Sequence, residues 1–416
     1  MSRAYVIGAG LAGLVAAERL SASGRDVVLF EASPKAGGRC RSYRDDRLGR
    51  VIDNGNHLVL SANRAVLDWA TRIGGREALE IGEAAYPFLD LASGERWTVR
   101  PGRGPFGALT AAARPPGVSA PVLMRDLAGL LTTSRTRTVA QAIRRGPAWH
   151  TFWDPMTRAV LNEDPEHGSA ALLRAALLRS FARGSKAARP VFAPNGLGPA
   201  LIDPALDLLA GRGVDIRLRS PVSGLEGGDS LRALVVGGDR HVLGAGDVAI
   251  LALPPRQAAS LLPGARFPEP GRAILNAHFR IGDTPLPPLL ALIGGDAHWL
   301  FRRGDVVSVT VSAEEAAPLA DAPREAALAR LWSDVAASIA AHGGTPPSEM
   351  PPARLLRERA ATFDQSPAGA AARHAPRTRW RNLLLAGDHV ATGLPATLEG
   401  AVRSGLRAAD LALRAR

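Results

Sequence analysis

The first thirty residues contain the feature that most restricts how this chain can fold. Residues 4–7 form a short apolar run, a glycine-rich stretch follows at 8–13, and the apolar spacing of residues 11–20 predicts a helix. Residues 26–30 then predict a second buried strand. A strand, a loop, a helix and a strand in this order form a βαβ unit, whose crossover is almost always right-handed.

The glycine-rich stretch matches the G-x-G-x-x-G fingerprint of dinucleotide-binding folds, and it lies between a strand and a helix as the fingerprint requires. Gly8 permits the tight turn, Gly10 lets the backbone approach a pyrophosphate, and Gly13 allows close helix–strand contact. Glu31 ends the second strand, where a carboxylate accepts hydrogen bonds from ribose hydroxyls. The dinucleotide contacts predicted here are Gly8, Gly10, Leu11, Ala12, Gly13 and Glu31.

The residues after the second strand indicate which dinucleotide binds. A carboxylate at Glu31 repels a 2′-phosphate, which favours NAD or FAD over NADP. The pair Gly37–Gly38 lets the chain lie against the cofactor, and Arg39 can neutralise its phosphates. Residues 8–39 together resemble the flavin-dependent amine oxidase, phytoene desaturase and squalene-associated desaturase group. This resemblance implies FAD.

A second glycine-rich segment, residues 385–405, looks like the closing flavin motif of that group. In the family, the pair corresponding to Gly387–Asp388 meets the ribityl chain and pyrophosphate, and the helix that follows points its N-terminus at the flavin pyrimidine ring. A helix N-terminus stabilises the negative charge that a reduced flavin carries near N1 and O2. The flavin contacts that the resemblance implies here are Gly387, Asp388, Thr397, Leu398, Glu399 and Ala401.

Two central segments complete the resemblance. Residues 194–198 resemble the glycine turn that starts a helix, after which a strand passes the adenine and is expected to end near Val222. Residues 252–254 resemble the strand end that returns the chain to the cofactor, with Pro254 in contact with it. The fold class expected is α/β, a Rossmann-like FAD-binding domain of the glutathione reductase type 2 (amine oxidase-like) class interleaved with an α+β substrate domain. The FAD-binding domain is expected over residues 1–86, 191–270 and 378–416, and the substrate domain over 87–190 and 271–377.

Residues 53–57 and 393–400 look most like one branch of the group, the squalene-associated FAD-dependent desaturases. That likeness implies an oxidoreductase of squalene and hopanoid biosynthesis that reductively dehydroxylates hydroxysqualene, a C30 isoprenoid. Gly55, Asn56 and His57 are then expected beside the flavin ring. An allylic alcohol leaves more readily once a general acid protonates it, and His57 and Asp53 are the candidate acids.

Several alternatives stay open. The chain could be a carotenoid or phytoene-type desaturase or an amine oxidase, although 5% aromatic residues make an aromatic substrate cage hard to find. A flavin-free lipid carrier of the same fold is disfavoured by the retained cofactor motifs. The chain has one dinucleotide fingerprint, so electrons must come from a separate reductase, from NADPH bound without a fingerprint or from a quinone, and the sequence does not choose. No residue spacing suggests a metal site.

Net charge and cysteine content indicate which partners and which cellular compartment to expect. The net charge of +12 is nearly all arginine, and no aromatic–basic module accompanies it, so nucleic acid is not an expected partner. Cys40 is the single cysteine and lies outside the closing motif, which predicts non-covalent FAD and a cytoplasmic protein. A C30 substrate favours peripheral contact with anionic lipid at the inner face of the cell membrane. The basic residues proposed for this contact are Arg125, Arg135, Arg137, Arg144 and Arg145.

The remaining pattern predicts secondary structure at lower resolution. Residues 33–56 are expected to form an extended loop and residues 58–73 a helix, and residues 87–99 predict a hairpin around Ser93–Gly94. Residues 106–181 are expected to be mostly helical. Further strands are expected at 214–218, 247–253, 274–281, 306–311 and 383–385, and further helices at 198–209, 324–341 and 398–413.

Overall fold

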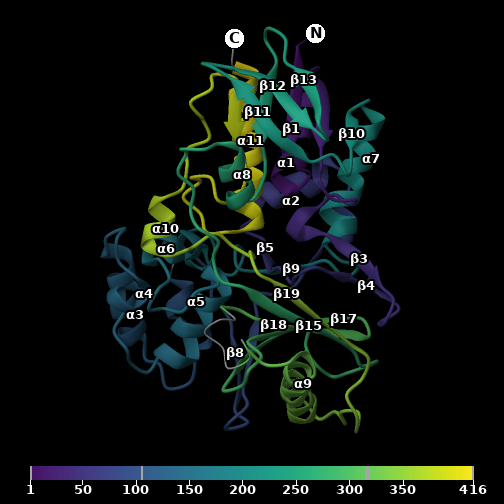
Figure 1. Cartoon of the computed structure of the whole chain (residues 1–416). Helices are drawn as coiled ribbons and strands as arrows, with labels where there is room; N and C mark the ends of the chain where they lie inside the picture. The colour runs from purple at the N-terminus through teal and green to yellow at the C-terminus, as the bar shows by residue number, and fades with distance from the viewer. Residues whose placement is uncertain (1, 105, 314–318, 320, 415–416) are drawn as a thin grey trace.

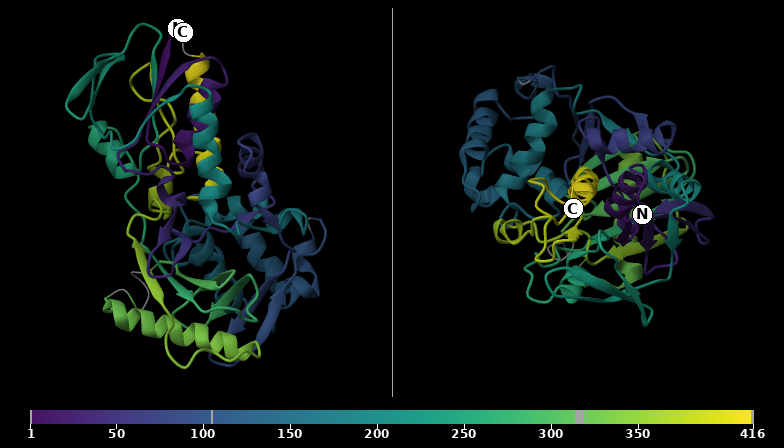
Figure 2. Two further views of the ribbon diagram at one scale, coloured as in Figure 1. Left: turned by 90° about the vertical axis from the view of Figure 1, so that its right-hand side faces the viewer. Right: turned by 90° about the horizontal axis from the view of Figure 1, so that it is seen from above.

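The computed structural model describes residues 2–104, 106–313, 319 and 321–414. A parallel sheet and the helices around it form one end of the molecule, and both chain ends lie there (Figures 1 and 2). A mostly antiparallel sheet and helix α9 form the opposite end, with a group of helices beside it. Segments from both halves of the sequence contribute to each end.

The parallel sheet has the strand order β10-β2-β1-β14-β20. Its strands are β1 (Arg3–Ile7), β2 (Asp26–Phe30), β10 (Asp215–Arg217), β14 (Val248–Leu251) and β20 (Leu383–Leu385). All four pairings are parallel, and β1 lies between β2 and β14. Apart from the edge strand β10, these strands are short, mainly apolar runs that are largely buried on both faces, as expected where helices cover a parallel sheet. The predicted Rossmann-like arrangement is therefore confirmed.

Helices from opposite ends of the chain pack together against this sheet (Figure 2). The helices around it are α1 (Leu11–Ser21), α2 (Arg64–Arg72), α7 (Asp203–Gly211), α8 (Pro255–Leu261) and α11 (Leu398–Arg414). A Cβ atom added at Gly405 of α11 would lie 2.3 Å from the carbonyl oxygen of Ala12 in α1, so these two backbones approach as closely as glycine allows. The last helix therefore completes the domain that the first helix begins.

The second sheet lies at the opposite end of the molecule and has the strand order β19-β15-β18-β17-β16-β7-β8. Its strands are β7 (Tyr86–Asp90), β8 (Arg96–Val99), β15 (Ile274–Arg280), β16 (Leu289–Ile293), β17 (Trp299–Arg303), β18 (Val306–Val311) and β19 (Ala353–Glu358). Helix α9 (Arg324–Ala341) packs against it with an apolar face that includes Leu331 and Val335. The predicted hairpin, the strands β15 and β18 and helix α9 are confirmed, whereas β16, β17 and β19 were not predicted.

A helical layer covers the second sheet on one side (Figure 1). It contains α3 (Ala120–Thr132), α4 (Val139–Ala142), a π-helical turn (Trp149–Trp153), α5 (Asp154–Leu161) and α6 (Ala170–Arg179), with α10 (Pro367–Ala371) packed on α6. Trp153 is fully buried at its centre and donates its indole N–H to Asp126 over 3.0 Å. The prediction that residues 106–181 are mostly helical is confirmed.

Three expectations were wrong in detail. Residues 33–56 include a hairpin, β3 (Ser42–Asp45) with β4 (Arg50–Asp53), rather than only a loop. The expected helix 58–73 begins only at Arg64, because Val59–Leu60 form β5 and pair with β9 (Pro190–Phe192), which also pairs with β6 (Glu80–Ile81). No strand ends near Val222. That residue begins β11 (Val222–Gly227) of a separate sheet with β12 (Leu231–Val236) and β13 (Asp239–Val242).

Candidate active site

The glycine loop at the end of β1 forms an open cradle. Gly37 donates its N–H to the carbonyl of Ala9 over 2.8 Å, so the two glycine segments lie against each other. A Cβ atom added at Gly10 would meet nothing within 4 Å, whereas one at Gly13 would lie 1.9 Å from the carbonyl oxygen of Gly8. Gly13 is therefore required for packing, and Gly10 leaves free space at the N-terminus of α1, where a pyrophosphate binds in such folds.

Glu31 is held in place by the cradle itself. One carboxylate oxygen accepts the N–H of Ala9 and the other accepts the N–H of Ser33, both over 2.8 Å. Each oxygen retains acceptor capacity, since a carboxylate can accept about four hydrogen bonds. The assignment of Glu31 to the ribose hydroxyls stays a prediction, and its position at the carboxyl end of β2 is the one that the assignment requires.

Arg39 joins the two cofactor motifs. Its guanidinium donates to the carboxylate of Asp388 over 2.6 Å and to the carbonyl of Ala361 over 2.7 Å. Burial alone would raise the pKa of Asp388, but Arg39 beside it lowers that pKa, so the carboxylate is ionised. The position of Gly387 also suits glycine, because its φ is +143° and an added Cβ would lie 2.6 Å from the ring of His389.

Arg373 is a structural residue of the site that sequence reasoning missed. Its guanidinium donates to the carbonyls of Asp388 and Leu394, over 2.8 and 2.7 Å, and also contacts the carbonyl of Val390. Burial lowers the pKa of Arg373 to about 10. Arg373 thus fixes the loop that leads from β20 into α11. It precedes the recognised motif, residues 385–405, by twelve residues, so the only signal available was an arginine in an Arg-rich chain.

The N-terminus of α11 faces the cavity of the site. The hydroxyl of Thr397 accepts the N–H of Gly400 over 3.1 Å and thereby caps the helix. Glu399 is buried and accepts hydrogen bonds from the N–H of Val66 over 3.2 Å and from Arg403 over 2.6 Å. Thr397, Leu398 and Glu399 line the cavity, whereas Ala401 does not. Glu399 therefore joins α11 to the start of α2.

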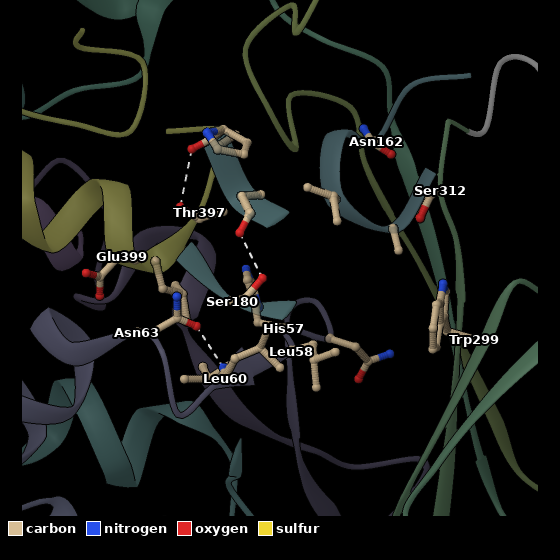
Figure 3. A pocket seen from close by; sticks show the side chains of 18 of the residues that line it. His57, Leu58, Leu60, Asn63, Asn162, Ser180, Trp299, Ser312, Thr397 and Glu399 are labelled. Carbon is tan, nitrogen blue, oxygen red and sulfur yellow. Dashed lines mark hydrogen bonds between the residues drawn. The ribbon is translucent and has the colours of Figure 1, made fainter. Parts of the chain in front are cut away.

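A cavity of about 330 Å³ lies between α11, the helical layer and the second sheet (Figure 3). In that view Trp299 and Ser312 lie on one side, Thr397 and Glu399 on the other, and His57 between them. The aromatic residues that line the cavity are Tyr86, Phe88, Phe152, Phe181, Trp299 and Phe301. These rings come from four separate segments of the chain, which explains why such a group was hard to find in the sequence.

His57 lines the cavity together with Gly55 and Asn56. Its Nδ1–H donates to the carbonyl of Gly55 over 3.0 Å, and Nε2 has no hydrogen-bond partner among residues 2–104, 106–313, 319 and 321–414. Burial lowers the pKa of His57, although Asp53 nearby acts in the opposite direction. The imidazole is therefore mainly neutral at pH 7 and can take up a proton at Nε2.

Asp53 lies outside the cavity lining, which disfavours its assignment as an acid. The hydroxyl of Ser42 and the N–H of Leu197 donate to one of its oxygens, and Arg303 pairs with the other. The residue is 1% exposed, so the carboxylate has no access to a substrate in the cavity. Asp53 instead holds the β3–β4 hairpin against the segment before α7 and against β17.

The other predicted contacts lie around the glycine cradle rather than in the cavity. Leu11 and Ala12 form the buried first turn of α1. A Cβ at Gly38 would lie 3.4 Å from the Cα of Gly10, and one at Gly8 would lie 2.4 Å from the carbonyl oxygen of Ala252, two residues before Pro254. Val222 packs on the outer face of the parallel sheet. Whether Val222 and Pro254 contact the cofactor stays a prediction.

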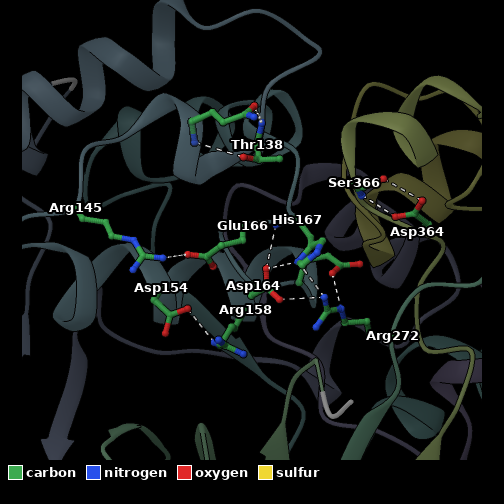
Figure 4. Close-up of polar contacts among 12 residues, drawn as sticks. Thr138, Arg145, Asp154, Arg158, Asp164, Glu166, His167, Arg272, Asp364 and Ser366 are labelled. Carbon is green, nitrogen blue, oxygen red and sulfur yellow. Dashed lines mark hydrogen bonds and ion pairs between the residues drawn. The ribbon is translucent and has the colours of Figure 1, made fainter. Parts of the chain in front are cut away.

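An ion-pair cluster behind the cavity connects the helical layer with the start of β15 (Figure 4). Arg272 pairs with Glu163 over 2.8 Å and with Asp164 over 3.0 Å, and His167 contacts Asp164 over 2.7 Å. Asn162, which lines the cavity, donates to the carbonyl of Arg272 over 2.6 Å. Burial raises the pKa of Glu163 to about 7. The cluster therefore holds the cavity wall at Asn162.

The cradle, the Arg39–Asp388 link and the capped N-terminus of α11 together fit FAD, because each leaves donors or open space where that cofactor places its ribose, phosphates and ring. Comparison with known proteins agrees with this fit. The chain belongs to the flavin-containing amine oxidoreductase family, whose sequence model matches residues 11–413. The protein is thus an FAD-dependent oxidoreductase.

Individual relatives narrow the comparison. A hydroxysqualene dehydroxylase from Rhodopseudomonas palustris is 44% identical over 99% of this chain and 98% of its own length. A second hydroxysqualene dehydroxylase, from Sinorhizobium fredii, is 41% identical over 98% of both chains. Cyclohexylamine oxidase from Brevibacterium oxydans has the same fold, with a TM-score of 0.73 at 15% identity over 99% of both chains. The predicted family and branch are confirmed.

In the part of the chain that the structure describes, no group of three or more His, Cys, Asp or Glu side chains could hold a metal ion. None of the helices in that part is long and apolar enough to cross a membrane.

We expect the flavin to be released completely when the protein is precipitated with acid. Cys40 is buried, burial raises the pKa of its thiol to about 12, and it does not line the cavity, so it is a poor nucleophile toward a flavin ring. The measurement is the absorbance of the supernatant and pellet at the flavin wavelengths. A yellow pellet that survives washing with denaturant would contradict the prediction and would direct attention to His57.

Proposed function

We propose that this protein reductively dehydroxylates hydroxysqualene to squalene, as the names of its relatives suggest. The observation that carries the proposal is a mostly apolar cavity that reaches the capped N-terminus of α11 and contains one histidine, His57. In this reaction the C–O bond breaks, the oxygen leaves as water after taking up one proton, and the carbon gains a hydride. Reduced FAD supplies that hydride when bound.

The residues of the chain have separate tasks in this scheme. Protonated His57 donates from Nε2 to the leaving oxygen, while its Nδ1–H stays on the carbonyl of Gly55 and fixes the ring. The aromatic residues hold the isoprenoid and exclude water from the reacting carbon. Electrons come from an external donor, for which a reductase, NADPH and a quinone are all consistent with the single dinucleotide site.

The charge of the cavity argues against an amine substrate. The charged residues that line it are Arg39, Arg64, Arg158, Arg179, Arg183, Arg403, Glu358 and Glu399. Arg39, Arg158 and Arg403 are paired with Asp388, Asp154 and Glu399, so the positive excess of the lining comes from Arg64, Arg179 and Arg183. A protonated amine is repelled by such a lining, whereas an uncharged isoprenoid is not.

The decisive experiment is anaerobic incubation of the FAD-loaded protein with dithionite and hydroxysqualene, followed by mass spectrometry of the lipid extract. Squalene that forms only with protein, FAD and reductant together supports the proposal. Absence of squalene, combined with oxidation of phytoene or of an amine in parallel incubations with oxidised enzyme, would replace it with one of the other activities of the fold.

We further propose that the mouth of the cavity contacts anionic lipid at the inner face of the cell membrane. Arg64, Arg179 and Arg183 are exposed residues of the cavity lining, and none of them forms an ion pair with any residue that the structure describes. Leu178 beside them is 47% exposed. Among the arginines that the sequence predicted for this contact, Arg125 is instead paired with Asp126. Arg145 is paired with Glu166 (Figure 4).

Replacing Arg179 and Arg183 together by alanine is expected to lower binding to anionic vesicles roughly 30-fold, since each basic residue near such a surface contributes about 1 kcal/mol. The measurement is flotation with phosphatidylcholine vesicles that contain or lack phosphatidylglycerol, at low and high salt. The matched control replaces Arg232 and Arg240, which are exposed on the β11–β13 sheet. Binding that depends neither on anionic lipid nor on salt would refute this contact.

A further inference from the structure

Three polar side chains on the cavity wall form a connected chain of hydrogen bonds, which we name the amide seam: Asn56, Asn276 and Thr310. Asn56 Nδ2 donates to Thr310 Oγ1 over 3.0 Å, and Thr310 Oγ1 donates to Asn276 Oδ1 over 3.0 Å. All three residues line the cavity, and Asn276 and Thr310 are 1% and 6% exposed. Buried amides are costly unless their polar groups form hydrogen bonds.

The amide seam continues a row that crosses the second sheet. Thr310 on β18 is the direct partner of Trp299 on β17 and of Asn276 on β15. Directly opposed residues of an antiparallel sheet lie on the same face. The row therefore changes from aromatic to polar as it approaches the loop that contains Asn56.

One acceptor of the amide seam has no partner. Asn56 Oδ1 is buried and makes no hydrogen bond within residues 2–104, 106–313, 319 and 321–414. An unsatisfied buried acceptor of this kind is free to take a hydrogen bond from a ligand, and a hydroxyl group is a donor of the right size.

The amide seam also lies beside His57. A Cβ atom at Gly55 would lie 3.6 Å from Asn276 Nδ2 and 3.8 Å from His57 Cε1. The absence of a side chain at Gly55 therefore leaves a small space bounded by the amide of Asn276 and the imidazole of His57. An oxygen in that space is within reach of both the amide seam and the proposed acid.

We propose that the amide seam is the subsite for the substrate hydroxyl and makes the enzyme bind its alcohol substrate more tightly than its hydrocarbon product. This inference rests on the proposed function. Asn56 Oδ1 accepts a hydrogen bond from the substrate hydroxyl while the alcohol is intact. This hydrogen bond is lost once the oxygen leaves as water. The seam residues are positioning residues, since they orient the oxygen toward His57 and transfer no proton to it.

The test measures dissociation constants of hydroxysqualene and squalene for the oxidised, FAD-loaded protein in the same detergent, from the quenching of tryptophan fluorescence and the shift of the flavin spectrum. The wild-type protein is expected to prefer the alcohol by about tenfold or more, the size of one satisfied buried hydrogen bond. Asn56→Leu and Thr310→Val are expected to remove most of this preference and to leave squalene binding within about twofold of wild type. Ser180→Ala is the control, because Ser180 lines the cavity but bonds only to the carbonyl of Ala176.

The outcomes separate this inference from the proposed function. If the wild-type protein makes squalene but the seam variants keep the wild-type ratio of dissociation constants, the hydroxyl subsite is wrong and the reaction stands. The inference is also overturned if Asn56→Leu loses most of its FAD while the fraction that still holds FAD keeps the wild-type ratio of dissociation constants. In that case Asn56 contributes to FAD binding and not to the choice between alcohol and hydrocarbon. If the Asn56 variant does not fold, the same dissociation constants can be measured on Thr310→Val, since valine is a favourable residue in a strand.

Discussion

Replacing Gly10 by glutamate is expected to yield a folded but colourless protein. A side chain at this position would meet no protein atom within 4 Å, so the fold has room for it. It would occupy the open space at the N-terminus of α1 with a negative charge, where the pyrophosphate binds. Like charges in contact cost several kcal/mol, and about 1.4 kcal/mol is a tenfold change in affinity, so FAD should bind at least roughly 100-fold more weakly.

The measurement is flavin content per protein after purification with excess FAD, together with the circular dichroism spectrum and thermal midpoint of the apoprotein. Gly228→Glu is the matched control, because its Cβ also faces open space but lies in the turn between β11 and β12. Full flavin occupancy in the Gly10 variant would remove the glycine cradle from the site. Gly387→Glu should lose flavin as well, but its φ of +143° adds backbone strain that complicates the comparison.

Replacing His57 by alanine is expected to leave FAD bound and to lower turnover of hydroxysqualene by about 10² to 10⁴, the usual contribution of a general acid. The reason is that no other histidine lines the cavity and that Asp53 is buried in contacts with Ser42, Leu197 and Arg303. A substrate analogue whose oxygen leaves without protonation, such as a phosphate ester, should recover most of the loss. Unchanged turnover in this variant would leave the proton donor unassigned.

The pH dependence gives an independent check on His57. Burial lowers the pKa of His57 below the ordinary histidine value of about 6.5, so the protonated acid is lost as the pH rises through that lowered pKa. Wild-type kcat/KM should therefore fall with rising pH at every pH above this lowered pKa, and the alanine variant should lack this decrease. His150→Ala, at an exposed histidine outside the cavity lining, should keep the wild-type profile.

Helices and strands that are defined by their own residues were predicted well. The 18-residue helix Arg324–Ala341 and the strand Leu383–Leu385 have the predicted bounds, because periodicity and flanking residues define them. Three strands of the second sheet, β16, β17 and β19, were missed, although β16 and β17 pair with each other along the chain. Leu289–Ile293 is flanked by prolines and glycines and is stabilised by parallel pairing with β7, some two hundred residues earlier. A strand of this kind is defined by its partner rather than by its own sequence.

The same distinction applies to the site. The glycine positions could be read from the sequence because each motif is contiguous, and the cradle of Gly10 and the cap at Thr397 lie where the motifs indicate. Asp53 could not be assigned correctly, since its use depends on Arg303 from β17. The amide seam was only partly visible, because Asn276 and Thr310 become neighbours of Asn56 through the second sheet.

The pairing of α1 with α11 has a consequence for how the protein is made. Helix α1 emerges from the ribosome early, but its contact Gly405 and strand β20 are synthesised only after most of the other residues described here. Domains usually fold as units during synthesis, N-terminal first, yet this one must wait until these later segments have been made. A premature stop codon anywhere before β20 therefore leaves the apolar face of α1 uncovered, and the truncated product should aggregate or be degraded rather than retain partial activity.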